Sequence, residues 1–436
     1  MFRRALTICS YLALALSALI VLVLVAYRLD APQVVRGDPG DEFDPGERRE
    51  RRTAAERRRV PWPTFGYDVS RTKVGAGFRH RPPYRERWQF DSGDTVEFPP
   101  SVGYGKVFLA QQKGRFYALD AATGRLAWTK RYGRCSASSP TLANGVVYQT
   151  WMGEVPCTQD RYRSADGFLA AWRARDGSEL WRFTVKPIES SPLYHRGTIY
   201  IGSWDHSIYA LRARDGHIRW RFEADGQLNA TPAYYRGAVL IASKQGSLYS
   251  LDAATGRLRW RARSDRRLGR REEFYASPVA AYGRVYVGNV DGTFHAYGAR
   301  TGRLLWQRPV GTYVYSSAAV WRQRVYVGTY NGELLALDAA TGDVIWRRET
   351  AAAVHSAPVV INGVLYYASC STCGQRAVRP VKQGHDGTYA LDARTGRELW
   401  RFRAGKYASP VVADQRRVYI VGRAKLFALS GSRRAR

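Results

Sequence analysis

The sequence predicts an all-β protein: an eight-bladed β-propeller of four-stranded blades, closed by its N- and C-terminal strands and preceded by one transmembrane helix. Eight tryptophans recur at intervals of 40, 53, 39, 40, 46, 40 and 54 residues, close to the length of one blade. A glycine precedes seven of them by four residues, where a tight turn needs a positive backbone angle. An apolar run over residues 5–26 is long enough to cross a bilayer.

Residues 1–30 are predicted to be a cytoplasmic stub and a signal anchor. Arg3 and Arg4 precede the apolar run, and basic residues favour the cytoplasmic side of a membrane. No small-x-small cleavage site follows the run, although a cleaved signal peptide remains the alternative. We therefore expect a single-pass protein of the cell membrane, with the propeller on the extracytoplasmic side.

Residues 31–60 form a charged, arginine-rich linker. Acidic residues dominate 38–47, and seven arginines lie between Arg48 and Arg59. Such a run predicts a solvated spacer that is partly helical. Its functional alternative is contact with an anionic surface.

Residues 61–430 repeat one unit, seen most fully in Leu119–Trp128, Leu251–Trp260 and Leu337–Trp346. Upstream runs such as Arg284-Val-Tyr-Val-Gly288 alternate β-branched and aromatic residues, which indicates strands. One four-stranded sheet cannot cover its own apolar faces, so the blades must stack radially. The tryptophans of the outer strands should fill the space toward the next blade: Trp88, Trp128, Trp181, Trp220, Trp260, Trp306, Trp346 and Trp400.

The eighth blade is predicted to combine both ends of the repeat region. Residues 408–429 supply three strand patterns without a closing tryptophan, and residues 84–90 supply a tryptophan strand without partners. Joining them removes two open sheet edges, which would otherwise favour aggregation. Residues 431–436 are a basic tail.

The formal net charge of +31 does not indicate a nucleic-acid partner. Of the 68 basic residues, 59 are arginine, and many lie at the predicted turns, evenly around the ring. Nucleic-acid binding would need a clustered basic stripe and a binding motif. Attraction to acidic envelope polymers or anionic lipid headgroups is the better interpretation for an exported domain.

The five cysteines suggest two disulfides. Cys135 and Cys157 flank the inner strands of one blade, and Cys370 and Cys373 form a Cys-Ser-Thr-Cys pair. Paired cysteines in an exported domain favour disulfide bonds. A redox or metal site is the alternative for the Cys370/Cys373 pair, although a metal would want further ligands. Cys9 lies in the apolar run as a small hydrophobe.

The repeated phrase Ala-x-Asp-x-x-Thr-Gly-x-x-x-Trp resembles the tryptophan-docking motif of pyrroloquinoline-quinone (PQQ)-type propellers. That superfamily includes quinoprotein dehydrogenases and non-catalytic BamB-type assembly factors. Residues Trp62–Thr72 also resemble the lead-in before its first blade. The resemblance covers about residues 61–430 and is specific for the fold, but one fold hosts several activities.

One rim of the central channel is the candidate ligand site. Reading one position per blade, at the start of each innermost strand, gives a mostly polar and aromatic set: Glu97, Ala137, Glu189, Asn229, Tyr275, Tyr315, His355 and Tyr407. Leaving out Ala137, these groups suit a small-molecule pocket, and a water-filled funnel is the alternative. Long insertions at residues 151–163 and 370–385 belong to the same rim, where binding loops are expected.

The resemblance implies two function classes. A quinoprotein dehydrogenase would need PQQ, a calcium ion and an acidic base, and Glu189 with Asn229 resembles the calcium-ligand pair. Tyr275 stands where the acidic residue would be wanted, and the adjacent cysteines of many such enzymes are missing. The departures favour a non-catalytic binding or scaffold protein in envelope protein assembly or sensing, with envelope proteins as partners. The alternative is a membrane-bound quinoprotein oxidoreductase with PQQ and calcium.

Overall fold

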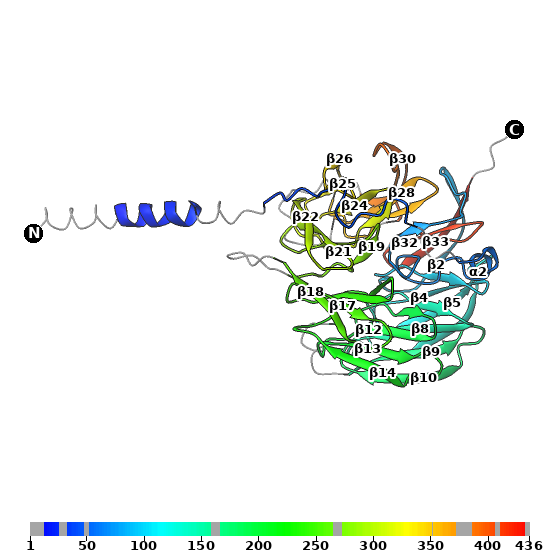
Figure 1. Ribbon diagram of the computed structural model, residues 1–436. Helices are drawn as coiled ribbons and strands as arrows, with labels where there is room; N and C mark the ends of the chain where they lie inside the picture. The colour runs from blue at the N-terminus through cyan, green and yellow to red at the C-terminus, as the bar shows by residue number, and fades with distance from the viewer. Residues whose placement is uncertain are drawn as a thin grey trace, which may run out of the picture.

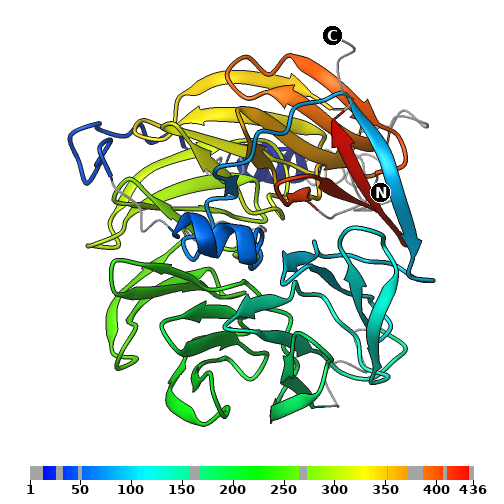
Figure 2. The ribbon, with the colours of Figure 1, turned by 90° about the vertical axis from the view of Figure 1, so that its right-hand side faces the viewer.

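A ring of eight sheets makes up the protein (Figures 1 and 2). The computed structural model describes residues 13–25, 33–47, 52–157, 166–264, 273–350, 352–371, 386–405 and 410–431. Each sheet is one blade, and the strands within a blade follow one another as antiparallel neighbours. The all-β, eight-bladed prediction is confirmed.

The blades are numbered in chain order. Blade 1 contains β3 (Ser101–Gly103), β4 (Lys106–Ala110), β5 (Arg115–Asp120) and β6 (Leu126–Arg131), and blade 2 contains β7 (Thr141–Ala143), β8 (Val146–Trp151), β9 (Gly167–Arg173) and β10 (Glu179–Val185). Blade 3 contains β11 (Leu193–His195), β12 (Thr198–Gly202), β13 (Ser207–Arg212) and β14 (Ile218–Glu223), and blade 4 contains β15 (Ala233–Tyr235), β16 (Ala238–Ala242), β17 (Ser247–Asp252) and β18 (Leu258–Arg263). Blade 5 contains β19 (Val279–Ala281), β20 (Arg284–Gly288), β21 (Thr293–Gly298) and β22 (Leu304–Pro309), and blade 6 contains β23 (Ala319–Trp321), β24 (Arg324–Gly328), β25 (Glu333–Asp338) and β26 (Val344–Glu349). Blade 7 contains β27 (Val359–Ile361), β28 (Val364–Ser369), β29 (Gly387–Asp392) and β30 (Glu398–Phe402), and blade 8 contains β31 (Val412–Ala413), β32 (Val418–Gly422), β33 (Lys425–Gly431) and β2 (Tyr84–Asp91).

Blade 8 closes the ring as the sequence predicts. Strand β2 pairs antiparallel with β33 over seven residue pairs, from Tyr84 opposite Gly431 to Asp91 opposite Lys425. Figure 2 shows the blue N-terminal strand beside the red C-terminal strand. Both ends of the repeat region thus bury their apolar residues in one core shared with blades 1 and 7.

The repeated tryptophans join neighbouring blades. Seven of them donate their indole N–H to the carbonyl oxygen of the repeat alanine in the next blade, over 3.0 to 3.4 Å. The indole also lies against that blade's turn glycine. At Gly256, for instance, φ is +74° and a Cβ atom would come within 2.7 Å of the Trp220 ring. The motif therefore needs glycine both for the turn and for contact with the tryptophan.

Trp400 differs from the other seven because it faces the seam where the two chain ends meet. No Thr-Gly turn can join β33 to β2, since these strands come from opposite ends of the repeat region. Trp400 instead meets Tyr84 edge to face, with ring centroids 5.1 Å apart. Tyr84 thus lies beside the last docking tryptophan.

Residues 61–75, which we call the channel segment, cross the channel on the face that carries the Thr-Gly turns (the turn face). Its carbonyl oxygens accept hydrogen bonds from the innermost strands of blades 2, 4, 5, 6 and 7, through the amides of Leu142, Tyr234, Ala280, Val320 and Val360. Trp62 forms a two-way bridge with Val102 of blade 1. The segment ends in β1 (Val74–Gly75), which adds a fifth, parallel strand to blade 7. It closes this end of the channel.

Two buried basic side chains fix the channel segment. The Arg71 guanidinium is fully buried and donates to the carbonyl oxygens of Pro232 and Pro192 and to the Thr64 hydroxyl. Lys73 donates to the Ala318 carbonyl over 3.0 Å. Burial lowers the pKa of Arg71 to about 9 and that of Lys73 to about 7. These bonds connect one short segment to opposite sides of the ring.

Residues 33–47 of the predicted linker, which we call the strap, are exposed or half-buried and lie against the ring. Val35 pairs with Gln307 on the outer strand of blade 5, and Glu47 accepts the amide proton of Tyr282. Arg236 forms an ion pair with Asp44 over 2.8 Å. The strap's acidic residues thus meet arginines and backbone amides of blades 4 and 5, and its Arg36 pairs with Asp343 of blade 6, partners that composition alone does not identify.

The expected partial helix is α2 (Ala54–Arg59), which begins with a capping box between Thr53 and Glu56. Its carbonyl oxygens accept bonds from the Tyr104 amide of blade 1 and the Gln415 side chain of blade 8. The helix therefore lies against the turn face beside the channel segment.

The membrane anchor stays a prediction. Residues 13–25 of the predicted span are helical (Figure 1), and the rest of 5–26, with Cys9, lies outside the described residues. Among the described residues, no helix is both long and apolar enough for a membrane span.

Candidate functional site

A pocket lies in the central channel against the channel segment and opens on the other face of the ring, which we call the pocket face; its volume is about 550 Å³, including solvent at the mouth. The structure brings six of the seven predicted rim residues into its lining: Glu97, Glu189, Asn229, Tyr275, Tyr315 and His355. Tyr407 lies outside the described residues. Six blades contribute one group each, because the start of every innermost strand points to the same axis.

The Ser-Pro motifs build the wall below this rim. The amides of Ser139, Ser191, Thr231 and Ser277 each donate to the hydroxyl at the equivalent position of the next blade, over 2.9 to 3.0 Å. The serine or threonine is thus a link between blades. This link also fixes the position along the channel of the rim residue that lies two residues earlier in the chain.

One side of the pocket is acidic. Glu189 is buried, and its carboxylate accepts hydrogen bonds from the Tyr275 hydroxyl and the Asn229 amide group. Burial raises its pKa, although Tyr275, Lys244 and Asn229 act in the opposite direction. Burial and the nearby Glu189 together raise the pKa of half-buried Glu97 to about 7. Two carboxyl groups therefore share one poorly solvated space.

Asn229 leaves one acceptor unused. Its Nδ2 donates to Glu189, while its buried Oδ1 has no hydrogen-bond partner. The side chain is 7% exposed and lines the pocket. An unpartnered buried acceptor is costly, and here it lies beside two carboxyl groups.

The opposite side is an aromatic stack. The rings of Tyr275 and Tyr315 lie 4.2 Å apart, and Tyr315 lies 4.5 Å from His355. Burial lowers the pKa of His355 to about 4, so this imidazole is neutral at pH 7. Its Nδ1 is hydrogen-bonded to the Tyr330 hydroxyl. This side of the pocket therefore carries no positive charge to balance the carboxyl groups.

Three residues at the site, Phe65, Phe98 and Lys244, were not predicted from the sequence. Phe65 of the channel segment lines the pocket and, with Phe98, provides an apolar floor; their ring centroids are 6.2 Å apart. Lys244 lies over the outer face of Tyr275, 5.6 Å from its centroid, without lining the pocket. The aromatic residue within the lead-in was a usable signal for Phe65, but nothing in the repeat indicates Lys244.

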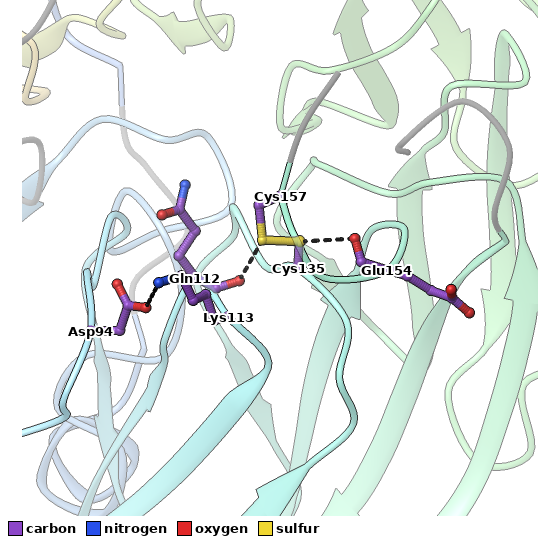
Figure 3. Close-up of a disulfide and its surroundings, with 6 residues drawn as sticks. All are labelled: Asp94, Gln112, Lys113, Cys135, Glu154 and Cys157. Atoms are coloured by element: carbon purple, nitrogen blue, oxygen red, sulfur yellow. Dashed lines mark hydrogen bonds and ion pairs between the residues drawn. A yellow bond between two sulfur atoms is a disulfide. The ribbon is translucent and has the colours of Figure 1, made fainter. Parts of the chain in front are cut away.

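A disulfide fixes a loop at the edge of the pocket face. Cys135 and Cys157 are bonded, with Cα atoms 5.7 Å apart, as the sequence predicted. The bond ties the connection between blades 1 and 2 to the β8–β9 loop, beside Gln112 of blade 1 (Figure 3). Cys370 is also disulfide-bonded. Its predicted partner Cys373 lies outside the described residues, as do most of the predicted loops at 151–163 and 370–385.

The described residues do not fit PQQ and calcium well. PQQ carries three carboxylates, and neither arginine nor lysine is among the described residues that line the pocket. Calcium takes six to eight oxygen ligands. The described part of the chain offers two carboxyl groups and one amide oxygen there, and it holds no cluster of three or more His, Cys, Asp or Glu suited to a metal ion.

The chain matches the protein family described as outer membrane protein assembly factor BamB over residues 83–160, 165–369 and 295–433. No curated protein sequence matches it. Among solved structures, BamB from Moraxella catarrhalis is similar at 16% identity and a TM-score of 0.63, covering 80% of this chain and 100% of that one.

Two redox enzymes have the same fold. Quinohemoprotein alcohol dehydrogenase from Comamonas testosteroni is 14% identical with a TM-score of 0.67, covering 86% of this chain and 81% of that one. A europium-containing methanol dehydrogenase is 12% identical with a TM-score of 0.69, covering 85% of this chain and 98% of that one. At these identities the similarity shows the fold alone.

Proposed function

We propose, from the premise that this chain belongs to the family of outer membrane protein assembly factor BamB, that it is a membrane-anchored, extracytoplasmic propeller with a non-catalytic binding or scaffolding role in the cell envelope. Protein assembly and sensing are the two forms that this role can take. Envelope proteins are the expected partners.

The main support for this proposal is that the two faces of the ring carry different parts of the chain. The turn face holds the strap, α2 and the channel segment, all from the chain's own N-terminal region. The pocket face holds the mouth of the channel and the disulfide-tied loop. Binding function usually resides in loops on one rim of a rigid scaffold, so the pocket face is the expected binding side. The Cys135–Cys157 bond supports an oxidising, extracytoplasmic location.

The second candidate is a membrane-bound quinoprotein oxidoreductase with PQQ and calcium. The contact between Glu189 and Asn229, with the unpartnered Asn229 Oδ1, is the observation in its favour. The lack of a basic residue among the described lining residues counts against it, because a tricarboxylate would meet two carboxyl groups.

A cofactor titration separates the two candidates. Purified full-length protein is incubated with PQQ and calcium chloride, separated from free quinone, and assayed by absorbance and by dye-linked alcohol oxidation. The binding proposal expects neither bound quinone nor turnover. Stoichiometric quinone and turnover that both disappear in Glu189→Ala/Asn229→Ala would establish the oxidoreductase instead.

Membrane anchorage is tested separately. Membranes from expressing cells are washed with alkaline carbonate, and intact cells are then treated with protease. If the protein is anchored and extracytoplasmic, it should stay in the membrane pellet. The propeller should be cut by protease added to cells whose outer layers are permeabilised but whose cytoplasmic membrane is intact. Release by carbonate, or protection from protease, would contradict it.

A further inference from the structure

We propose that the pocket binds the head of a primary amine, with its –NH₃⁺ group held by Glu97, Glu189 and the Asn229 Oδ1. This deepens the binding role proposed above by naming a ligand class. The three acceptors stand just before the innermost strands of blades 1, 3 and 4 and meet only in the closed ring.

The two carboxyl groups of the pocket favour a cationic ligand. Both glutamates line it, and the only histidine in its described lining is neutral at pH 7. Among the described residues, Lys244 acts on Glu189 electrostatically, but its ammonium lies over the Tyr275 ring and does not line the pocket. Lys73 lies 5.2 Å from the centroid of Phe65 and is hydrogen-bonded to the Arg71 and Ala318 carbonyls, outside the lining. The described lining therefore places no counter-ion beside the two carboxyl groups.

The acceptor count favours an amine over a hard metal ion. A primary ammonium has three N–H donors and no acceptor. Glu97 and Glu189 each supply a carboxylate acceptor, and Asn229 Oδ1 is a buried acceptor with no partner. Calcium would need about twice as many oxygen ligands. A quaternary ammonium would leave Asn229 Oδ1 without a donor.

The remaining lining suits the carbon chain of an amine. Phe65 and Phe98 form an apolar floor, and Tyr315 closes the aromatic side. The faces of Tyr275 and Tyr315 cover each other at 4.2 Å, so their edges bound the space. An alkyl or arylalkyl chain can therefore lie against apolar surface while its charged end reaches the acidic side.

The test is calorimetric titration of the full-length protein at pH 8 with n-butylammonium chloride. Its matched probes are n-butanol, which has the same chain without charge, and tetramethylammonium chloride, which has charge without N–H groups. We expect saturable binding of butylammonium and at least tenfold weaker binding of both others. Equal binding of butanol, or saturable binding of calcium chloride in place of butylammonium, would overturn the proposal.

Variants link the binding to the named groups. Glu189→Gln should weaken butylammonium binding at least tenfold, and Asn229→Ala provides a second test should the first variant fold poorly. Glu86→Gln, an exposed glutamate on β2, is the matched control and should leave binding unchanged. Unchanged binding in both folded pocket variants would refute the assignment.

The amine could be a free small molecule or a lysine side chain of a partner protein. A blocked tripeptide, acetyl-Gly-Lys-Gly-amide, and its Nε-acetylated twin distinguish these sources. Tighter binding of the lysine peptide than of butylammonium, lost on acetylation, indicates a protein partner; the reverse order indicates a small amine. PQQ-dependent turnover would refute the proposed non-catalytic function. The amine proposal is refuted separately, by the butylammonium titrations.

Discussion

Replacing Glu97 with glutamine should stabilise the propeller by an amount that grows as the pH rises from about 4.5 to about 7. Burial and Glu189 raise the pKa of Glu97 from 4.5 to about 7. The folded state therefore binds this proton more tightly than the unfolded state. The stability that Glu97 contributes is fully present below about pH 4.5 and is lost as the pH rises to about 7.

The pKa difference sets the size of the effect. Each pH unit between the folded and unfolded pKa corresponds to about 1.4 kcal/mol, so the full difference is about 3 kcal/mol. Glu97 is half-buried, and solvent at the pocket mouth screens part of it. We expect Glu97→Gln to raise the free energy of unfolding by about 1 to 3 kcal/mol at pH 8, with little change at pH 4.5.

Denaturant unfolding at the two pH values measures this difference. The titratable groups that interact with Glu97 are Glu189, Tyr275 and Tyr315, and the Glu86→Gln variant controls for the loss of one charge from the molecule. An equal change at both pH values would show that Glu97 is solvated in solution. Destabilisation at pH 8 would mean that a bound cation already neutralises the pair.

Three further predictions concern the ring. Trp306 is fully buried and donates to the Ala339 carbonyl, so Trp306→Ala should lower the free energy of unfolding by about 3 to 5 kcal/mol. Trp400→Ala should lower it less, because Trp400 is half-buried at the seam. Equal losses of stability in thermal melts would contradict the docking argument. Deleting β33 should lower the melting temperature of the whole ring because β2 loses its partner, and an unaltered melt would refute closure by both ends. Mass spectrometry of non-reduced, alkylated peptides should recover Cys135 joined to Cys157, and complete alkylation of both would place the domain in a reducing compartment.

The period of the tryptophans determined the fold. A four-stranded unit with a turn glycine and a docking tryptophan can bury its faces only against another copy of itself, so the repeat count and the two incomplete ends lead to eight blades. The rim residues follow from the same logic, since equivalent positions in a ring converge on one axis. Glu97, Glu189, Asn229, Tyr275, Tyr315 and His355 were therefore found by counting alone.

The tertiary structure decided the features that do not repeat. The channel segment and the strap each pair with several blades far apart in sequence, and no local pattern encodes such long-range partners. Composition suggested that residues 33–47 are a solvated spacer. They are exposed or half-buried, and ion pairs with Arg236 of blade 4 and Arg303 of blade 5 hold them against the ring. Likewise, the sequence named Asn229 and Glu189 as neighbours, but only the packed pocket leaves the Asn229 Oδ1 buried without a donor. The Asn229 side chain has two polar atoms, Oδ1 and Nδ2, and the tertiary structure decides which of them finds a hydrogen-bond partner.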